Sequence, residues 1–483
     1  MSKNIICSLC FLFIAIISTA QNIDWNNSGG NSRKNGYADI AGPTTDSILW
    51  QTASNGIFGT PVFIEGNYLV TMRFQSQTYA PVECYDLNSG NLLWTVDVTD
   101  STGRSLPVGL RDNRVYVVRY TESLSDTLYA LNVADGSRIW TANVTVAPYI
   151  SETGVFDAAG NFYISGQGYL RTYKINPQNG QMIWQANTVP MASGSGEMVI
   201  NNDNKTGYTL EQNGGISYLW ATDLSNGTKK YSRVVNALQA GGNVPQSAIM
   251  LGNDGVVYVQ LTEDNVAALK DDGSQITLLW QTKIGGNASF SLMCVGPDGS
   301  VYAPTDGKIV RLDPLNGDTL SLSQSVTQGG FFSPRLTAAN NNMIYMTNGE
   351  NYIYAFDYDL NLLWSNYFPV TNTSGVSISA NGLAAVAGQN GIRVYTPTSL
   401  INGLDTDIAS LLSIYPNPSS SRVNIKADYI LSGKIYSLID LNGRTLKTGI
   451  TAENTELDLS EFSSGLYYLK IEGISQVFKI MKM

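Results

Sequence analysis

A turn followed by a tryptophan recurs through most of this 483-residue chain. It reads YDLNSGNLLW up to Trp94, YALNVADGSRIW up to Trp140 and YKINPQNGQMIW up to Trp184. In each copy an aromatic, strand-like segment precedes an Asn/Asp-Gly turn, and the tryptophan stands four residues after the turn glycine. The equivalent position is filled in successive units by Trp50, Trp94, Trp140, Trp184, Tyr231, Trp280, Ser321 and Trp364. The chain is therefore built from a repeated unit.

The segments between these positions supply further strands. RDNRVYVV (111–118) and GPDGSVYAP (296–304) each place turn residues directly before a strand, and TLYALN (127–132) supplies another. Asn, Asp and Gly suit such turns because they tolerate the positive φ of a tight hairpin. With the strand that opens each unit, we count four strands per unit. Four-stranded units that recur about every 45 residues predict an all-β chain that folds as a β-propeller.

The two ends of the repeat region predict how the ring closes. Residues 375–397 contain three strands and no tryptophan, whereas Ser47–Ala53 is a lone tryptophan strand with no unit before it. Together they complete one blade, so that the N-terminal strand closes the ring. Seven internal units and this composite predict an eight-bladed β-propeller. Seven blades are the alternative, because Tyr231 and Ser321 depart from the pattern.

Composition removes several classes of function. The chain has no histidine, which excludes a Ser-His-Asp triad and zinc bound through imidazole. The net charge is −10, and an acidic surface repels phosphate backbones, so we expect no nucleic-acid partner. Charged residues make up 14 %, against roughly 25 % in typical soluble domains. The remaining polar surface comes from hydroxyl, amide and glycine residues, as in strands joined by turns.

One unit carries a recognisable motif. Its spacing, Ala130-x-Asn132-x-x-x-Gly136-x-x-x-Trp140, resembles the tryptophan-docking motif of pyrroloquinoline-quinone-type propeller repeats, and the likeness extends from Ile48 to about Pro397. We expect each indole to lie between neighbouring blades, against a small residue on the third strand. The expected docking residues are Trp50, Trp94, Trp140, Trp184, Trp280 and Trp364. The motif identifies no ligand, because members with and without the quinone share it.

The N-terminus predicts export. Lys3 precedes an apolar run, Ile5–Ile17, and small residues at 18 and 20 precede a cut before Gln21. The run is too short to cross a bilayer, so residues 1–20 are expected to form a signal peptide read by the Sec machinery. A retained anchor is the alternative. No later apolar run reaches membrane length, so we expect no transmembrane segment in the mature chain.

The tail is a second domain. After the propeller (21–397) and a linker (398–410), residues 411–483 alternate short strands with turns, which predicts a small Ig-like β-sandwich. This tail resembles the C-terminal sorting domain of the type IX secretion system. The matching residues are Pro416, Asn417, Pro418, Asn442, Gly443, Arg444, Gly465 and Tyr467. A binding module of the immunoglobulin type is the alternative.

The resemblance of the tail implies a route. It implies a Bacteroidetes-type source, passage through the periplasm, and transport across the outer membrane by the type IX secretion machinery. In that family the tail is usually removed, and the cargo is released or attached to the outer cell surface. We therefore expect a secreted or surface-attached protein.

Propellers bind ligands where inter-blade connections and the loops between second and third strands converge into a funnel. Aromatic and amide residues predicted there suit capture of a glycan or peptide. The candidate contacts are Phe58, Arg104, Tyr149, Gln239, Asn243, Gln328, Phe331 and Phe332. Filling the end of the barrel is an equally good explanation for these aromatics.

The sequence gives less support to a catalytic function than to a binding function. The repeat family includes quinone dehydrogenases, which, as the resemblance implies, hold quinone and Ca²⁺. The mature chain lacks their adjacent cysteines, and no calcium ligand set is apparent. We therefore assign no cofactor, metal or catalytic residue. The favoured function is a non-catalytic protein that binds protein, peptide or glycan. The alternative is an enzyme with a carboxylate or tyrosine in the funnel, with polysaccharide as the substrate class. Its candidate carboxylates are Glu122, Asp126, Glu197, Glu211, Glu263, Asp264 and Asp306.

Overall fold

A computed structural model describes most of the chain from residue 24 onward. The described residues are 24–53, 62–73, 79–100, 103–121, 126–146, 153–165, 172–186, 195–213, 216–235, 249–261, 265–285, 292–326, 334–348, 352–368, 375–388, 391–397, 412–427, 434–440, 444–452, 454–471 and 477–483. They form strands and turns and contain no α-helix. The predicted signal peptide and linker lie outside them.

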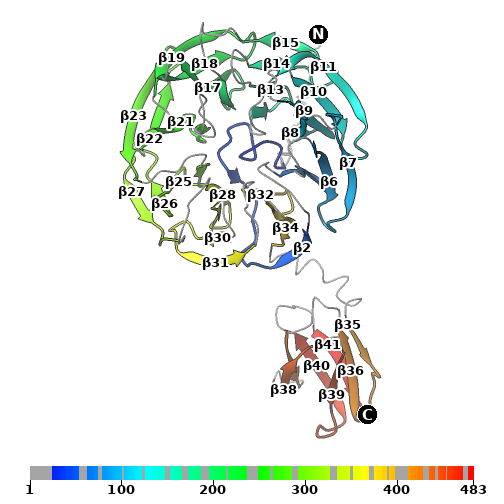
Figure 1. The fold of residues 1–483 in the computed structure, drawn as a ribbon. Helices are drawn as coiled ribbons and strands as arrows, with labels where there is room; N and C mark the ends of the chain where they lie inside the picture. The colour runs from blue at the N-terminus through cyan, green and yellow to red at the C-terminus, as the bar shows by residue number, and fades with distance from the viewer. Residues whose placement is uncertain are drawn as a thin grey trace, which may run out of the picture.

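Small antiparallel sheets surround a common centre between residues 37 and 395 (Figure 1). Alternating apolar residues and Gly/Asn/Asp turns form these strands, and buried Val, Ile, Leu and Tyr side chains pack between sheets. The first four sheets are β3(Phe63–Glu65)–β4(Tyr68–Met72)–β6(Val82–Asp86)–β7(Leu92–Val96); β5(Tyr79–Ala80)–β8(Gly103–Arg111)–β9(Arg114–Tyr120)–β10(Asp126–Asn132)–β11(Arg138–Val146); β12(Gly154–Phe156)–β13(Phe162–Ile164)–β14(Tyr173–Ile175)–β15(Met182–Gln185); and β16(Ser195–Ile200)–β17(Thr206–Asn213)–β18(Ile216–Asp223)–β19(Lys229–Val234).

The ring continues with four more sheets. They are β20(Ile249–Leu251)–β21(Val256–Leu261)–β22(Asn265–Asp271)–β23(Ile276–Lys283); β24(Cys294–Val295)–β25(Val301–Thr305)–β26(Lys308–Leu312)–β27(Thr319–Leu322); β1(Tyr37–Ala38)–β28(Arg335–Ala339)–β29(Met343–Thr347)–β30(Tyr352–Phe356)–β31(Leu362–Tyr367); and β32(Ser377–Ile378)–β33(Ala384–Gly388)–β34(Gly391–Tyr395)–β2(Ile48–Ala53). The last strand of each sheet lies at the rim (Figure 1).

The final sheet joins the two ends of the repeat region. β2 pairs antiparallel with β34, and Trp50 stands opposite Val394. This is the pairing predicted from the lone N-terminal strand and the three strands that lack a tryptophan. The first strand of the repeat region therefore completes the last sheet, and the arrangement is that of a propeller.

The ring has two unlike ends. Apart from the short β1 and β5, which pair parallel with β28 and β8, each sheet has four antiparallel strands. The turns between the first and second and between the third and fourth of these four strands therefore share one end, which we call the turn end. The connections between sheets and between second and third strands share the opposite end, the loop end. Most of those connections lie outside the described residues.

Residues 24–40 cross the centre of the ring at the turn end (Figure 1, dark blue). Trp25, Asn27, Lys34 and Asn35 are at most 5 % exposed. The segment has almost no regular structure; only β1 forms a strand, parallel to β28. We call residues 24–40 the central segment.

The tail forms two further sheets. One contains β35(Leu412–Tyr415), β36(Arg422–Ala427) and β39(Asn454–Asp458); the other contains β37(Ile435–Ile439), β38(Thr445–Ile450), β40(Gly465–Ile471) and β41(Val477–Lys482). Their apolar faces form one core, which includes Val423, Leu438, Leu457 and Leu469. The tail therefore has a core of its own.

Candidate functional site

The tryptophans of the repeat join neighbouring sheets. Six stand on the outer strand of a sheet, and in five of them the indole N–H donates to a backbone carbonyl in the outer turn of the next sheet. The bonds are Trp50 to Leu87 (2.7 Å), Trp94 to Val133 (2.7 Å), Trp140 to Pro177 (2.9 Å), Trp184 to Leu224 (2.9 Å) and Trp280 to Pro314 (2.9 Å). The Trp50 bond links the last sheet to the first, so a tryptophan contact of this kind is also present where the ring closes.

A glycine in each receiving turn lets the indole approach. Gly180 has a φ of +71°, and a Cβ there would stand 2.4 Å from the Trp140 ring. Any larger residue would strain the backbone and displace the indole. Within its own sheet Trp140 stands opposite Ala130, and Trp94 opposite Cys84, so each of these indoles has a small residue on the third strand beside it, as the sequence predicts.

Trp364 differs from the other five. Its Nε1 is buried and has no hydrogen-bond partner among the described residues. Its ring lies 6.1 Å from that of Tyr345 and 5.6 Å from that of Tyr395, measured between centroids. Apolar contact and ring packing therefore hold this joint.

A tyrosine joint replaces the tryptophan joint in the sheet that carries Tyr231. The Tyr231 hydroxyl donates to Asp271 Oδ1 of the next sheet at 2.6 Å. Tyr208 donates to Oδ2 of the same carboxylate at 2.9 Å. Burial and this carboxylate raise the pKa of both phenols, so the two donors keep their protons.

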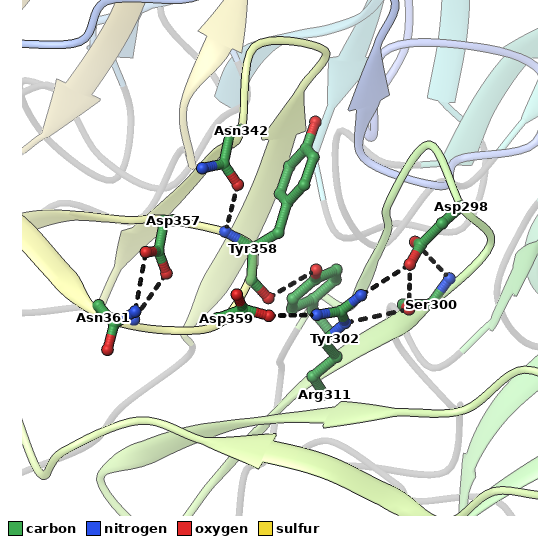
Figure 2. A network of polar contacts seen from close by, with 9 residues as sticks. All are labelled: Asp298, Ser300, Tyr302, Arg311, Asn342, Asp357, Tyr358, Asp359 and Asn361. Atoms are coloured by element: carbon green, nitrogen blue, oxygen red, sulfur yellow. Dashed lines mark hydrogen bonds and ion pairs between the residues drawn. The ribbon is translucent and has the colours of Figure 1, made fainter.

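An arginine network replaces the tryptophan joint where Ser321 stands (Figure 2). Arg311 on β26 contacts Asp298 of its own sheet and Asp359 of the next sheet, each at 2.7 Å. Tyr302 adds a bond from its hydroxyl to the Tyr358 carbonyl, 2.9 Å long. The two departures from the repeat are thus sites where polar contacts join the sheets.

The predicted funnel contacts lie almost wholly outside the described residues. Phe58, Tyr149, Gln239, Asn243, Gln328, Phe331 and Phe332 are among the residues whose structure is not described. Arg104 is described: it stands near the start of β8, half-buried, with its guanidinium 5.7 Å from the Tyr120 ring centroid. It lies at the loop end, as a funnel residue should, and its role in binding stays a prediction.

The candidate carboxylates that the structure describes are held by partners or exposed. Glu197 forms a buried ion pair with Lys34, 3.0 Å long, and Glu211 pairs with Lys229. Asp126 Oδ1 accepts two bonds from Thr121, and burial raises the pKa of this carboxyl. Asp306 is exposed, while Glu122, Glu263 and Asp264 lie outside the described residues.

The described residues offer no evident redox or metal chemistry. Cys84 and Cys294 are buried and free, in separate sheets. Burial raises the pKa of the Cys84 thiol to about 12 and that of Cys294 also. Within the described part of the chain no three or more Asp, Glu or Cys side chains gather as a metal site would require.

The central segment was not foreseen as part of any site. It covers the centre of the ring at the turn end, and a small hollow beside it is lined by Trp25, Ser28, Lys34 and Arg335 among others. The sequence NNSGGNSRKNG has no strand period, so nothing in the pattern of side chains reveals where it lies.

The motif residues of the tail hold its last strand. Asn417, between Pro416 and Pro418, donates from Nδ2 to the Lys479 carbonyl (2.6 Å) and accepts from the Met481 N–H (2.8 Å). The Arg444 N–H donates to Asp440 Oδ1, and the Tyr467 hydroxyl to the Ser463 carbonyl. Gly465 begins β40, and its Cβ position is open. Asn442 and Gly443 lie outside the described residues.

Comparison with known families assigns both parts. Residues 34–242 match the family model of "Outer membrane protein assembly factor BamB", built on PQQ-like repeats, and residues 413–483 match that of "Secretion system C-terminal sorting domain". Residues 34–242 are therefore a PQQ-like repeat region, and residues 413–483 are a type IX sorting domain. The sorting domain indicates secretion with attachment to the outer cell surface. No described segment is a helix long and apolar enough to cross a membrane.

Individual relatives agree with the propeller assignment. Outer membrane protein assembly factor BamB of Moranella endobia (strain PCIT) is 26 % identical over 314 residues, which are 60 % of this chain and 73 % of the relative. The structure of BamB from Moraxella catarrhalis superposes with a TM-score of 0.55 at 11 % identity, covering 72 % of this chain and 99 % of the other. Quinohemoprotein alcohol dehydrogenase from Comamonas testosteroni also gives 0.55, at 13 % identity over 78 % and 80 % of the two chains. At these identities the structures show the fold alone.

Proposed function

We infer that this protein is a non-catalytic binding or scaffold protein of the cell exterior. Its repeat region is an eight-bladed β-propeller, residues 21–397, in which each sheet around the centre is one blade. A signal peptide (1–20) directs it to the Sec machinery. A linker (398–410) joins it to an Ig-like β-sandwich (411–483), which the type IX machinery recognises. The ligand is a protein, peptide or glycan that binds at the loop end.

This proposal rests on the hydrogen-bond and ion-pair partners of the buried carboxylates. Among the described residues, the buried acidic side chains of the propeller each accept hydrogen bonds or an ion pair from a neighbouring side chain. They are Glu83, Asp126, Asp157, Glu197 and Glu211. General acid-base catalysis needs a carboxyl within reach of the substrate, whereas these serve the interior of the fold. The curated relative is described as an assembly factor, which supports a protein partner for this chain too.

A parallel screen tests the proposal. The purified mature protein is applied to glycan and peptide arrays and, separately, to polysaccharide hydrolysis assays. We expect retention of a ligand without turnover. Arg104→Ala should weaken that retention while the protein stays folded, because Arg104 stands at the loop end and only part of its side chain is buried. Arg233→Ala, at the rim, is the matched control. Turnover that a single loop-end carboxylate variant abolishes would instead establish an enzyme.

The route of export has its own test. Deleting residues 411–483 removes the whole sorting domain but none of the described propeller strands. We expect the truncated propeller to fold and to accumulate in the periplasm of the native host, as measured by fractionation and protease protection. Delivery of that variant to the cell surface would contradict the role assigned to the tail.

A further inference from the structure

The central segment contacts the inner strand of seven sheets in the ring and, in the last sheet, the turn that follows the inner strand. Backbone N–H groups of successive sheets donate to it as follows: Ile64 to Trp25 O (3.0 Å), Leu110 to Asn26 O (3.1 Å), Phe156 to Asn27 Oδ1 (3.1 Å), Ile200 to Ser32 O (2.8 Å), Leu251 to Arg33 O (3.0 Å), Val295 to Asn35 O (2.9 Å), Ala338 to Gly36 O (2.7 Å) and Ala380 to Asp24 Oδ1 (2.8 Å). The donors come from all eight sheets, and six of the eight acceptors are backbone carbonyls.

The donors lie on the open side of the inner strands. Apart from the short pairings of β5 with β8 and of β1 with β28, an inner strand has one neighbour in its sheet, so the N–H groups on its other side point toward the axis and need acceptors. At the turn end these groups form a closed row around the axis. A row of free backbone donors is what binds an extended peptide when a strand is added to a sheet edge.

The central segment is shaped to fill that row. Gly29 accepts from the Gly36 N–H, which folds the segment back on itself. Gly30, at a φ of +86°, lies against the Trp25 ring, where a Cβ would stand 2.7 Å away. Lys34 reaches Glu197 on β16, and both side chains are at most 2 % exposed. The charged pair fixes the register, because a shifted segment would leave a carboxylate buried without its cation.

We propose that the inner strands form a peptide-binding groove at the turn end of the ring, and that the central segment is its built-in ligand. We call this segment the latch, because it binds last and closes the ring. The order follows from the contacts. Asp24 bonds to Ala380, 356 positions away, so the latch is complete only when the inner strand of the final sheet is in place. Once in place, the segment covers the centre of the ring at the turn end.

Cutting the chain behind the latch tests this on the folded protein. A protease site is inserted between Thr44 and Thr45, which are exposed and lie between the latch and β2. After folding and cleavage, the latch peptide should co-elute with the ring in gel filtration at micromolar concentration. It should be released in denaturant and rebind when the denaturant is removed. Release from the native ring with unchanged Tm would overturn the proposal.

A trans experiment measures specificity. The chain from residue 41 onward, produced without the latch, should melt at least about 5 °C lower than the mature protein, and a synthetic peptide of residues 24–40 should restore the difference. If the shortened chain does not fold, exchange of labelled peptide into the nicked ring replaces it. The Lys34→Met peptide should bind at least tenfold more weakly. Arg33→Ala, which removes the same charge from a partly exposed side chain, should change affinity less than threefold. Equal binding of all three peptides would refute a register-specific groove.

Discussion

Removal of one docking indole gives the sharpest test of the sheet joints. Trp140 is 8 % exposed, donates to the Pro177 carbonyl of the next sheet, and packs edge-on against Tyr116 with centroids 5.8 Å apart. Trp140→Ala empties this space and leaves the carbonyl without its donor. Truncation of a buried tryptophan costs about 3–5 kcal/mol, and we expect that range here because backbone on both sides prevents collapse.

The expected shift in Tm follows from the size of the domain. Unfolding entropy is about 2.1 cal/mol/K per residue, so a propeller of about 370 residues loses about 4–6 °C for that free energy. Trp140→Phe keeps an aromatic ring but loses the N–H donor and part of the volume, and should lose about 1–3 °C. Gly180→Ala should lower Tm about as much as Trp140→Ala does, because a Cβ at position 180 would stand 2.4 Å from the Trp140 ring and displace the indole.

Calorimetry of the mature protein measures these shifts, with near-ultraviolet circular dichroism as a second probe. Leu315→Ala is the control, since that side chain is 86 % exposed and its loss should move Tm by less than about 1 °C. If Trp140→Ala melted within about 1 °C of the parent, the indoles would not be what joins the sheets, and the packing argument would be wrong.

Three other perturbations address different contacts. Arg311→Met removes two ion pairs with partly exposed carboxylates and should cost about 1 kcal/mol at low ionic strength and less in high salt, by thermal melts in both buffers. Burial raises the pKa of one tyrosine on the second strand of each of six sheets, so the folded protein keeps protons that the unfolded chain releases above about pH 10. Stability should therefore be complete below pH 10 and fall as the pH rises above it, with phenolate absorbance appearing together with unfolding; earlier ionisation would show these side chains to be exposed. They are Tyr116, Tyr163, Tyr208, Tyr258, Tyr302 and Tyr345. Asn417→Ala should expose the last strand of the isolated tail to proteolysis and reduce surface delivery, whereas Ser413→Ala on exposed β35 should do neither.

The regular part of the ring could be predicted because its signals are local. The spacing of glycine and tryptophan indicates two features at once. The glycine marks the turn between the third and fourth strands, and the tryptophan four residues later marks the side chain that contacts the equivalent turn of the next sheet. The pairing of β2 with β34 could be predicted by counting strands. The repeat region begins with one strand that has no blade and ends with three strands that lack a fourth, so these two parts complete one sheet.

The substituted joints and the latch could not be predicted in the same way. Tyr231 and Ser321 were visible in the sequence only as departures from the repeat. The acids that complete these joints, Asp271 and Asp359, stand 40 and 38 residues further along the chain, in turns that contain several acidic residues. The latch bonds mostly through backbone carbonyls, and its Asn, Ser and Gly side chains resemble those of any loop. The funnel residues stay predictions, apart from the location of Arg104.

The direction of the last propeller strand places the two ends of the repeat region beside the latch. Residues 395–397 follow the third strand of the last sheet and pair near Ile48, at the turn end that the latch covers. The described chain therefore completes the propeller at the end opposite the connecting loops, where we expect the ligand to bind.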